Sequence, residues 1–194
     1  MSIALALPFH RMTVTEFLDW DSGDRTGARW QLRNGEPEMM APASDRHGSI
    51  QARLTHLLIA HLDARNSACR VVIAPGVIPS HRSEDNCLVP DLGVTRAPQT
   101  GARLLEKPLL LAEVLSPSNV SKTRANVRAY RTIATVTEIV VLHSTAVAAE
   151  VLRRGTDGAW PRQPELIDAG GILRLDCIGF AAPLRDVYRT SGLE

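Results

Sequence analysis

The chain has 194 residues, a formal net charge of +1 and only 4% aromatic residues. This length favours a single domain. The near-neutral charge excludes a surface that is basic overall, so any contact with nucleic acid must come from a local patch. The low aromatic content argues against base stacking as the main way of holding single-stranded nucleic acid.

Three cysteines, Cys69, Cys87 and Cys177, are odd in number, and their spacing fits no zinc motif. We interpret them as reduced core residues, which favours an intracellular protein. Residues 1–10 include a short apolar run with no basic segment before it. This run is too short for a membrane span and matches a secretory signal only weakly. We therefore expect a cytoplasmic protein without a membrane partner.

The first predicted elements are a short helix and a hairpin. The segment Thr13-Val14-Thr15-Glu16 has the pattern of a capping box and predicts a helix through Trp20. Asn34-Gly35 is a preferred pair for a tight turn because both residues accept positive φ. We therefore expect residues 29–33 and 36–40 to pair as strands.

A long helix is predicted next, capped by Ser44 or Asp45 and extending to about Arg65. Its apolar residues recur at helical spacing: Ile50, Leu54, Leu57, Leu58 and Leu62. His47 lies one turn before Ile50 on the same face, so we expect it to point inward. It would either support a functional site or simply pack and cap the helix.

The later segments are mostly strands. They are predicted at 70–78 with a break at Pro75-Gly76, and at 87–95, 109–115, 137–143, 146–153 and 171–175. A helix is predicted at 120–133, with Ser118 or Asn119 as its cap, and a helical turn at 183–188.

This order of elements predicts one α/β domain over residues 1–194, with a mixed central β-sheet flanked by helices. Strand 109–115 is apolar throughout except at its acidic residue, so we expect it to be central and covered on both faces. Parallel pairing across the helix 120–133 would follow the right-handed crossover rule.

Two acidic residues lie inside apolar, strand-like runs. Asp91 follows Pro90 within 87–94, and Glu113 lies within 109–115. Burying a carboxylate is costly unless it is compensated, and two carboxylates on neighbouring strands repel each other unless a cation lies between them. Hard oxygen ligands suit magnesium, manganese or calcium, so the pair predicts a divalent-metal site. The alternative is that Asp91 ends its strand in solvent and Glu113 pairs with an arginine.

Around these residues the sequence resembles a known family. Pro90-Asp91 is followed by Glu113-Val114-Leu115-Ser116-Pro117-Ser118 and by a predicted helix that contains Tyr130. This pattern is similar to the Uma2 family of restriction-endonuclease-like proteins, within the PD-(D/E)XK nuclease superfamily. The resemblance covers about residues 13–190. Further matching segments are 34–36, 43–47 and 137–141.

The resemblance implies a restriction-endonuclease-like fold and hydrolysis of DNA phosphodiester bonds that depends on Mg2+ or Mn2+. It implies that Asp91 and Glu113 are catalytic residues and metal ligands. Glu36 and His47 match positions that the family tends to fill, and we expect them to complete or orient the site.

The sequence departs from this family at the expected lysine. The residue two positions after Glu113 is Leu115, and the position four before Tyr130 holds Asn126. Lys122 lies one helical turn earlier, about 40° from Asn126 around the helix. This column is apolar otherwise, so we expect it to face inward, with Lys122 stabilising the attacked phosphate as a catalytic residue and Asn126 supporting it. The alternative is a lysine that reaches the surface and pairs there.

The opposite side of the same predicted helix carries Arg124, Arg128 and Arg131. Their spacing predicts a basic stripe that could bind DNA phosphates, although a solvated helix face would show the same pattern.

Two functions from different classes remain. The first is a metal-dependent DNA endonuclease, expected as a homodimer because cutting both strands needs two sites. The second is a catalytically weak or inactive nuclease-fold protein that acts as a binding or assembly module, which the displaced lysine and the low net charge favour. A serine hydrolase is disfavoured because the chain has no Gly-x-Ser-x-Gly motif.

Overall fold

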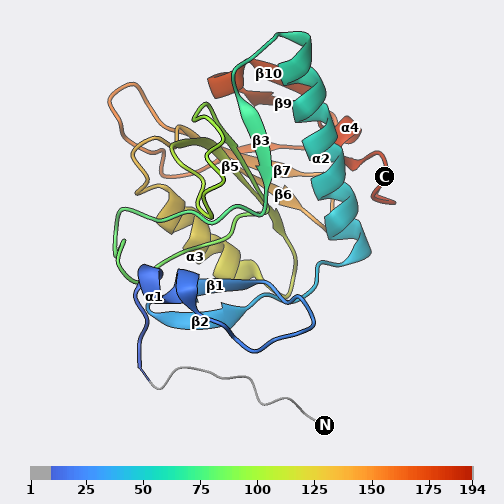
Figure 1. Cartoon of the computed structure of the whole chain (residues 1–194). Coiled ribbons are helices and arrows are strands. Elements are labelled where there is room, and N and C mark those ends of the chain that lie inside the picture. Colours follow the sequence, from blue (N-terminus) through green and yellow to red (C-terminus); the bar gives the residue numbers. More distant parts are fainter. Residues whose placement is uncertain (1–9, 194) are drawn as a thin grey trace.

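A six-stranded mixed sheet forms the centre of the protein in the computed structural model, which describes residues 10–193 (Figure 1). The strands lie in the order β3-β4-β5-β6-β7-β8. Their bounds are β3 (Arg70–Ile73), β4 (Leu92–Thr95), β5 (Pro108–Leu115), β6 (Glu138–His143), β7 (Ala149–Arg153) and β8 (Glu165–Ile167). Strands β5 and β6 are parallel and all other neighbours are antiparallel. The predicted α/β fold with a mixed sheet is therefore confirmed.

Helix α3 (Val120–Tyr130) connects the two parallel strands and covers one face of the sheet. The other face is covered by α2 (Asp45–Ala64), α4 (Leu184–Tyr188) and the hairpin of β9 (Ile172–Leu175) and β10 (Phe180–Pro183). Strand β5 is buried along nearly its whole length, as its apolar sequence predicts. The site residues that project from β5 toward α3 are thus enclosed between a sheet and a helix.

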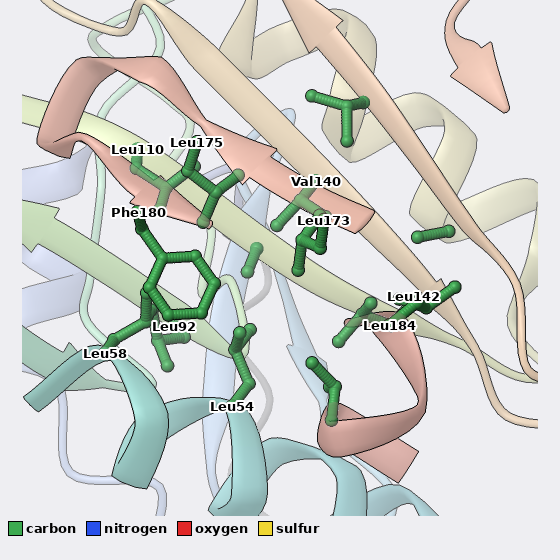
Figure 2. Close-up of a cluster of buried hydrophobic side chains, with 14 of the residues drawn as sticks. Leu54, Leu58, Leu92, Leu110, Val140, Leu142, Leu173, Leu175, Phe180 and Leu184 are labelled. Carbon is green, nitrogen blue, oxygen red and sulfur yellow. The ribbon is translucent and has the colours of Figure 1, made fainter. Parts of the chain in front are cut away.

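The core on the α2 side explains why the helix is held firmly. Leu54 and Leu58 of α2 are almost completely buried and face Leu92 of β4 and Phe180 of β10 (Figure 2). Burial of such a side chain stabilises the fold by about 1.5–3 kcal/mol. The apolar face of α2 therefore fixes its first turn, which carries His47, relative to the sheet.

The N-terminal part contains α1 (Val14–Asp19), with the predicted capping box between Thr13 and Glu16, and the hairpin of β1 (Trp30–Arg33) and β2 (Glu36–Met39). Asn34 and Gly35 form its turn, both with positive φ. The Leu32 amide donates a 2.8 Å hydrogen bond to the Cys87 carbonyl, and the Cys87 amide donates a 3.0 Å hydrogen bond to the Leu32 carbonyl. These bonds dock the hairpin onto the segment that leads into β4.

Several predicted boundaries differ from the structure. Residues 87–95 are not one strand, because Cys87 and Leu88 bridge to Leu32 and Val77 and only Leu92–Thr95 joins the sheet as β4. Pro90 lies between the two parts and has no amide to continue the ladder. Helix α3 ends at Tyr130 and not at 133. Just after its end, the hydroxyl and the amide of Thr132 both donate hydrogen bonds to the Ala129 carbonyl.

Other differences concern short strands. β8 and β10 were not predicted, β3 is shorter than the predicted 70–78, and β7 begins at Ala149 instead of 146. All three cysteines are free, with Cys69 and Cys87 buried and Cys177 partly buried. Within residues 10–193, no helix is long and apolar enough to cross a membrane. Residues 1–9, which include the apolar run considered as a membrane span or a secretory signal, lie outside the described residues.

Candidate active site

Asp91 and Glu113 lie opposite each other at the beginning of β4. Because Leu92 pairs with Ala112 in an antiparallel register, the residue before Leu92 is placed opposite the residue after Ala112. The amide of Val114 donates a 2.7 Å hydrogen bond to Asp91 Oδ2. The strand pairing therefore brings together the two carboxylates that the sequence singles out.

Helix α2 holds Asp91 from the other side. His47 Nε2 lies 2.9 Å from Asp91 Oδ1, and the Gln51 side-chain amide donates a 2.6 Å hydrogen bond to the Asp91 carbonyl. Both carboxylate oxygens of Asp91 thus have a partner. His47 points inward as expected, whereas Gln51 was not predicted, although it lies one turn after His47 on the same helix face.

Glu113 is almost completely buried and is held by two neutral donors from α3. Asn126 Nδ2 and the Tyr130 hydroxyl both donate to Glu113 Oε1, at 3.0 and 2.7 Å. Burial and the neighbouring Asp91 raise the pKa of Glu113 to about 8, although the two hydrogen bonds act in the opposite direction. Burial and Glu113 also raise the pKa of Tyr130, which therefore remains a proton donor. No cation makes a direct ion pair with Glu113 among the described residues.

The N-terminal hairpin contributes an arginine that sequence analysis missed. Arg33 Nη2 donates a 2.6 Å hydrogen bond to Asn126 Oδ1, and its Nε lies 3.3 Å from Glu38 Oε2. Gln31 Nε2 also donates to Glu38 Oε2, at 3.0 Å. The hairpin register places Gln31 opposite Glu38 and Arg33 opposite Glu36, so this polar face of the hairpin was visible in the alternation of the sequence.

Two predicted site residues lie elsewhere. The Lys122 side chain is 59% exposed, and its Nζ is 3.6 Å from Glu38 Oε2. The prediction that it points inward is wrong, because the first turn of α3 lies at the rim beside the hairpin, where Lys122 finds a carboxylate partner. The Glu36 side chain is 72% exposed, because it directly follows the hairpin turn. Its ion pair with Arg11 is loose, with 4.0 Å between Oε1 and Nη2. Glu38, two residues further along, contacts Gln31, Arg33 and Lys122 instead.

The predicted basic stripe on α3 is not a free surface. Arg124 donates two hydrogen bonds to Glu150 on β7, and Arg131 donates to the Pro161 carbonyl. Arg128 is the one member of the stripe that makes no hydrogen bond or ion pair with another described residue. The prediction of one exposed stripe therefore fails at Arg124 and Arg131, because the flank of α3 that carries Arg124 packs beside β7, where Glu150 is buried.

The oxygen atoms that could hold a divalent cation belong to Asp91 and Glu113. No group of three or more histidine, cysteine, aspartate or glutamate side chains is arranged to hold a metal within residues 10–193. Two carboxylates nevertheless fit magnesium or manganese, which keep waters or take substrate oxygens at their other positions. Glu113 Oε2 accepts no hydrogen bond from the described residues, and buried Gln31 Oε1 also has no donor. The donor set therefore fits a hydrated hard cation.

A mixed sheet with an aspartate and a glutamate on adjacent strands, covered by helices on both faces, is a nuclease-like arrangement of the restriction-endonuclease type. A sequence model of the Uma2 family, described as "Putative restriction endonuclease", matches residues 14–184. The chain belongs to this family.

A solved structure supports the same fold. It is described as "a putative nuclease belonging to DUF820" from Anabaena variabilis, with a TM-score of 0.72 and 17% sequence identity. The match covers 92% of this chain and 98% of the other. A search of curated proteins found no significant match.

Proposed function

We propose that the protein is an endonuclease that hydrolyses DNA phosphodiester bonds with the help of Mg2+ or Mn2+. The observation that supports this most directly is the Asp91–Glu113 pair, two adjacent carboxylates of which Glu113 makes no ion pair with any residue in the described range 10–193. Such a pair is unfavourable by itself and becomes favourable when a divalent cation binds it. The family to which the chain belongs supports the same chemistry.

In this proposal Asp91 and Glu113 hold the cation. When bound, a divalent cation polarises the phosphodiester and lowers the pKa of a coordinated water. His47 fixes the orientation of Asp91 through the 2.9 Å contact to Oδ1. Asn126 and Tyr130 orient Glu113 by occupying Oε1, which leaves Oε2 available. These neighbours hold the ligands in place before metal or substrate arrives.

The proposal includes a DNA partner, a homodimer and a cytoplasmic location. Cutting both strands of a duplex needs two sites, and a symmetric dimer is the commonest way to supply them. Light scattering at high protein concentration tests the dimer, and a monomer would remove this part of the proposal.

Manganese titration calorimetry tests the metal site. Asp91→Asn and Glu113→Gln are each expected to abolish binding while the protein remains folded, because each change removes charge but little volume. Glu36→Gln is the matched control, since it removes an exposed carboxylate, and it should bind manganese like the wild type. Plasmid cleavage in magnesium should be lost in the first two variants only. Unchanged affinity in Asp91→Asn or Glu113→Gln would reject the assignment.

The second candidate function is a catalytically weak nuclease fold that serves as a binding or assembly module. It is favoured by the position of Lys122, which is exposed and pairs with Glu38, and by the internal bonding of Arg124 and Arg131, because these predicted cations do not contact the two carboxylates. A wild-type protein that binds no manganese and cleaves no plasmid, yet binds a DNA duplex, would support this function instead.

A further inference from the structure

Arg33 is an arginine that lies close to the buried part of the candidate site, one amide group away from Glu113. Its side chain is 18% exposed, compared with 59% for Lys122. Arg124, the other candidate on α3, is bound to Glu150 through both of its terminal nitrogens. A site that takes a phosphodiester needs positive charge near the carboxylates to offset the charge of the phosphate.

A chain of hydrogen bonds connects Arg33 to the carboxylate pair. Arg33 Nη2 donates to Asn126 Oδ1 at 2.6 Å, and Asn126 Nδ2 donates to Glu113 Oε1 at 3.0 Å. One amide group therefore separates the guanidinium from Glu113. A lysine at position 126 could not make both contacts, because its side chain has no acceptor for the Arg33 guanidinium.

The guanidinium keeps unused donors. It has five N–H groups, and its hydrogen bonds with described residues use only Nε, toward Glu38, and one N–H of Nη2. The remaining N–H groups have no acceptor among the described residues. A guanidinium fork of this kind matches the spacing of two phosphate oxygens.

Glu38 holds this guanidinium in position. Glu38 Oε2 accepts hydrogen bonds from Arg33 Nε and Gln31 Nε2. Lys122 Nζ lies 3.6 Å from the same oxygen and forms an ion pair with it. The carboxylate is thus held by two hydrogen-bond donors and one ion pair, and Arg33 is held between Glu38 and Asn126. The side-chain entropy that an arginine would lose on binding is largely lost already in the folded protein, which favours binding of a further partner.

We propose that Arg33 binds a nonbridging oxygen of the phosphodiester at the Asp91–Glu113 site, with Glu38 and Asn126 as its positioning residues. This inference rests on the proposed function. It assigns to the N-terminal hairpin the positive charge that sequence analysis placed on Lys122 of α3.

The test compares three single variants. Affinity for a fluorescein-labelled DNA duplex is measured by anisotropy in calcium, and metal affinity by manganese calorimetry. Arg33→Ala should weaken duplex binding by about tenfold or more and should change manganese affinity by a smaller factor, because Arg33 reaches Glu113 only through Asn126. It should also reduce plasmid cleavage in magnesium by about a hundredfold. Arg11→Ala, the matched control, removes an exposed arginine near the same hairpin and should change neither affinity. Lys122→Ala should reduce duplex affinity less than Arg33→Ala does.

A double variant separates phosphate binding from a structural role. If Arg33 merely neutralised Glu38, then Arg33→Ala combined with Glu38→Gln would recover wild-type duplex affinity. If Arg33 binds phosphate, the double variant remains as weak as Arg33→Ala. Thermal unfolding of each variant verifies folding, and Arg33→Gln, which keeps a donor for Asn126, replaces Arg33→Ala if the latter does not fold.

The outcomes distinguish this inference from the proposed function. Wild-type duplex affinity in Arg33→Ala, an equal loss in Lys122→Ala, or no duplex binding by the wild type would overturn the role of Arg33. A wild type that binds no manganese and cleaves nothing would count against hydrolysis, whereas an Arg33-dependent duplex affinity in that protein would still support the phosphate contact.

Discussion

Two buried glutamates on the same face of the sheet have opposite surroundings. Glu113 of β5 pairs with Val141 of β6, and Val141 pairs with Glu150 of β7, so the three residues form one row beneath α3. Both carboxylates are about equally buried. The exposed fraction of the side chain therefore does not explain the difference between them.

The charged groups beside each carboxylate explain the difference. Arg124 donates to both oxygens of Glu150, at 2.5 and 2.6 Å, and His143 Nε2 lies 2.8 Å from Oε1. The hydrogen bonds from Arg124 lower the pKa of Glu150. Burial and the neighbouring Asp91 raise the pKa of Glu113, and its hydrogen-bond donors among the described residues are neutral. A carboxylate that serves the fold is supplied with a cation, and one that lacks it is a candidate for binding a cation from solution.

The largest expected effect is a pH dependence of stability that belongs to Glu113. Its pKa is about 8 in the folded protein, above its ordinary value near 4.5, so the folded state binds more protons between these pH values. Stability of the metal-free protein should therefore fall as pH rises through this window. The difference in the free energy of unfolding between wild type and Glu113→Gln is expected to change by on the order of a few kcal/mol across this pH window. Urea unfolding in chelator at pH 5, 6, 7 and 8 measures it, and parallel curves for the two proteins would contradict the prediction.

The contribution of Glu150 to stability should depend on pH in the opposite direction. Its pKa is lowered, so its contribution to stability is present above pH 4.5 and is lost as pH falls through its folded-state pKa. At neutral pH, Glu150→Gln should cost about 2 kcal/mol, because Arg124 loses its partner but can still be solvated in part. The control Glu165→Gln removes an exposed partner of Arg153 and should cost less than about 0.5 kcal/mol. Equal losses in urea unfolding would mean that the Arg124 pair is no stronger than a surface pair.

Manganese should stabilise the folded protein through Glu113 and not through Glu150. At a manganese concentration ten times the Kd, binding to the folded state adds about 1.4 kcal/mol. Wild type and Glu150→Gln should both show this gain as an increase in Tm, and Glu113→Gln should show none. An increase that persists in Glu113→Gln would place the metal elsewhere, and no increase in the wild type would favour the binding-module function.

Much of the fold was predictable because it depends on local patterns. The apolar spacing of α2 and the uninterrupted apolar run of β5 each predict one element, and their burial follows from the same residues. The Asp91–Glu113 pair was predictable because a carboxylate in an apolar strand is unusual wherever it occurs. Strand β8 was not predictable, since its three residues, Glu165–Ile167, are too few to show an alternation.

The charged groups around the site were less predictable. Arg33 contacts Asn126 across 93 positions of sequence, and no local pattern indicates such a pair. For Lys122 and Arg124, a helical wheel gives their angle relative to other residues of α3, but not which flank meets the hairpin and which meets β7. The assignment of positive charge therefore needed the tertiary structure.

The smallest expected effect concerns the hydroxyl of Tyr130, which donates a 2.7 Å hydrogen bond to Glu113 Oε1. Tyr130→Phe removes this hydrogen bond, which lowers the pKa of Glu113, and should cost about 1 kcal/mol of stability. Because the ionised carboxylate is the form that binds metal, manganese affinity should also fall by about fivefold. Tyr188→Phe is the matched control, since the buried Tyr188 hydroxyl donates an equally short 2.7 Å bond to the Ala148 carbonyl. It should lose similar stability in urea unfolding without changing the manganese affinity measured by calorimetry. If both variants changed metal affinity alike, the effect would come from general loosening of the fold, and the Tyr130 hydrogen bond would have no specific part in preparing Glu113.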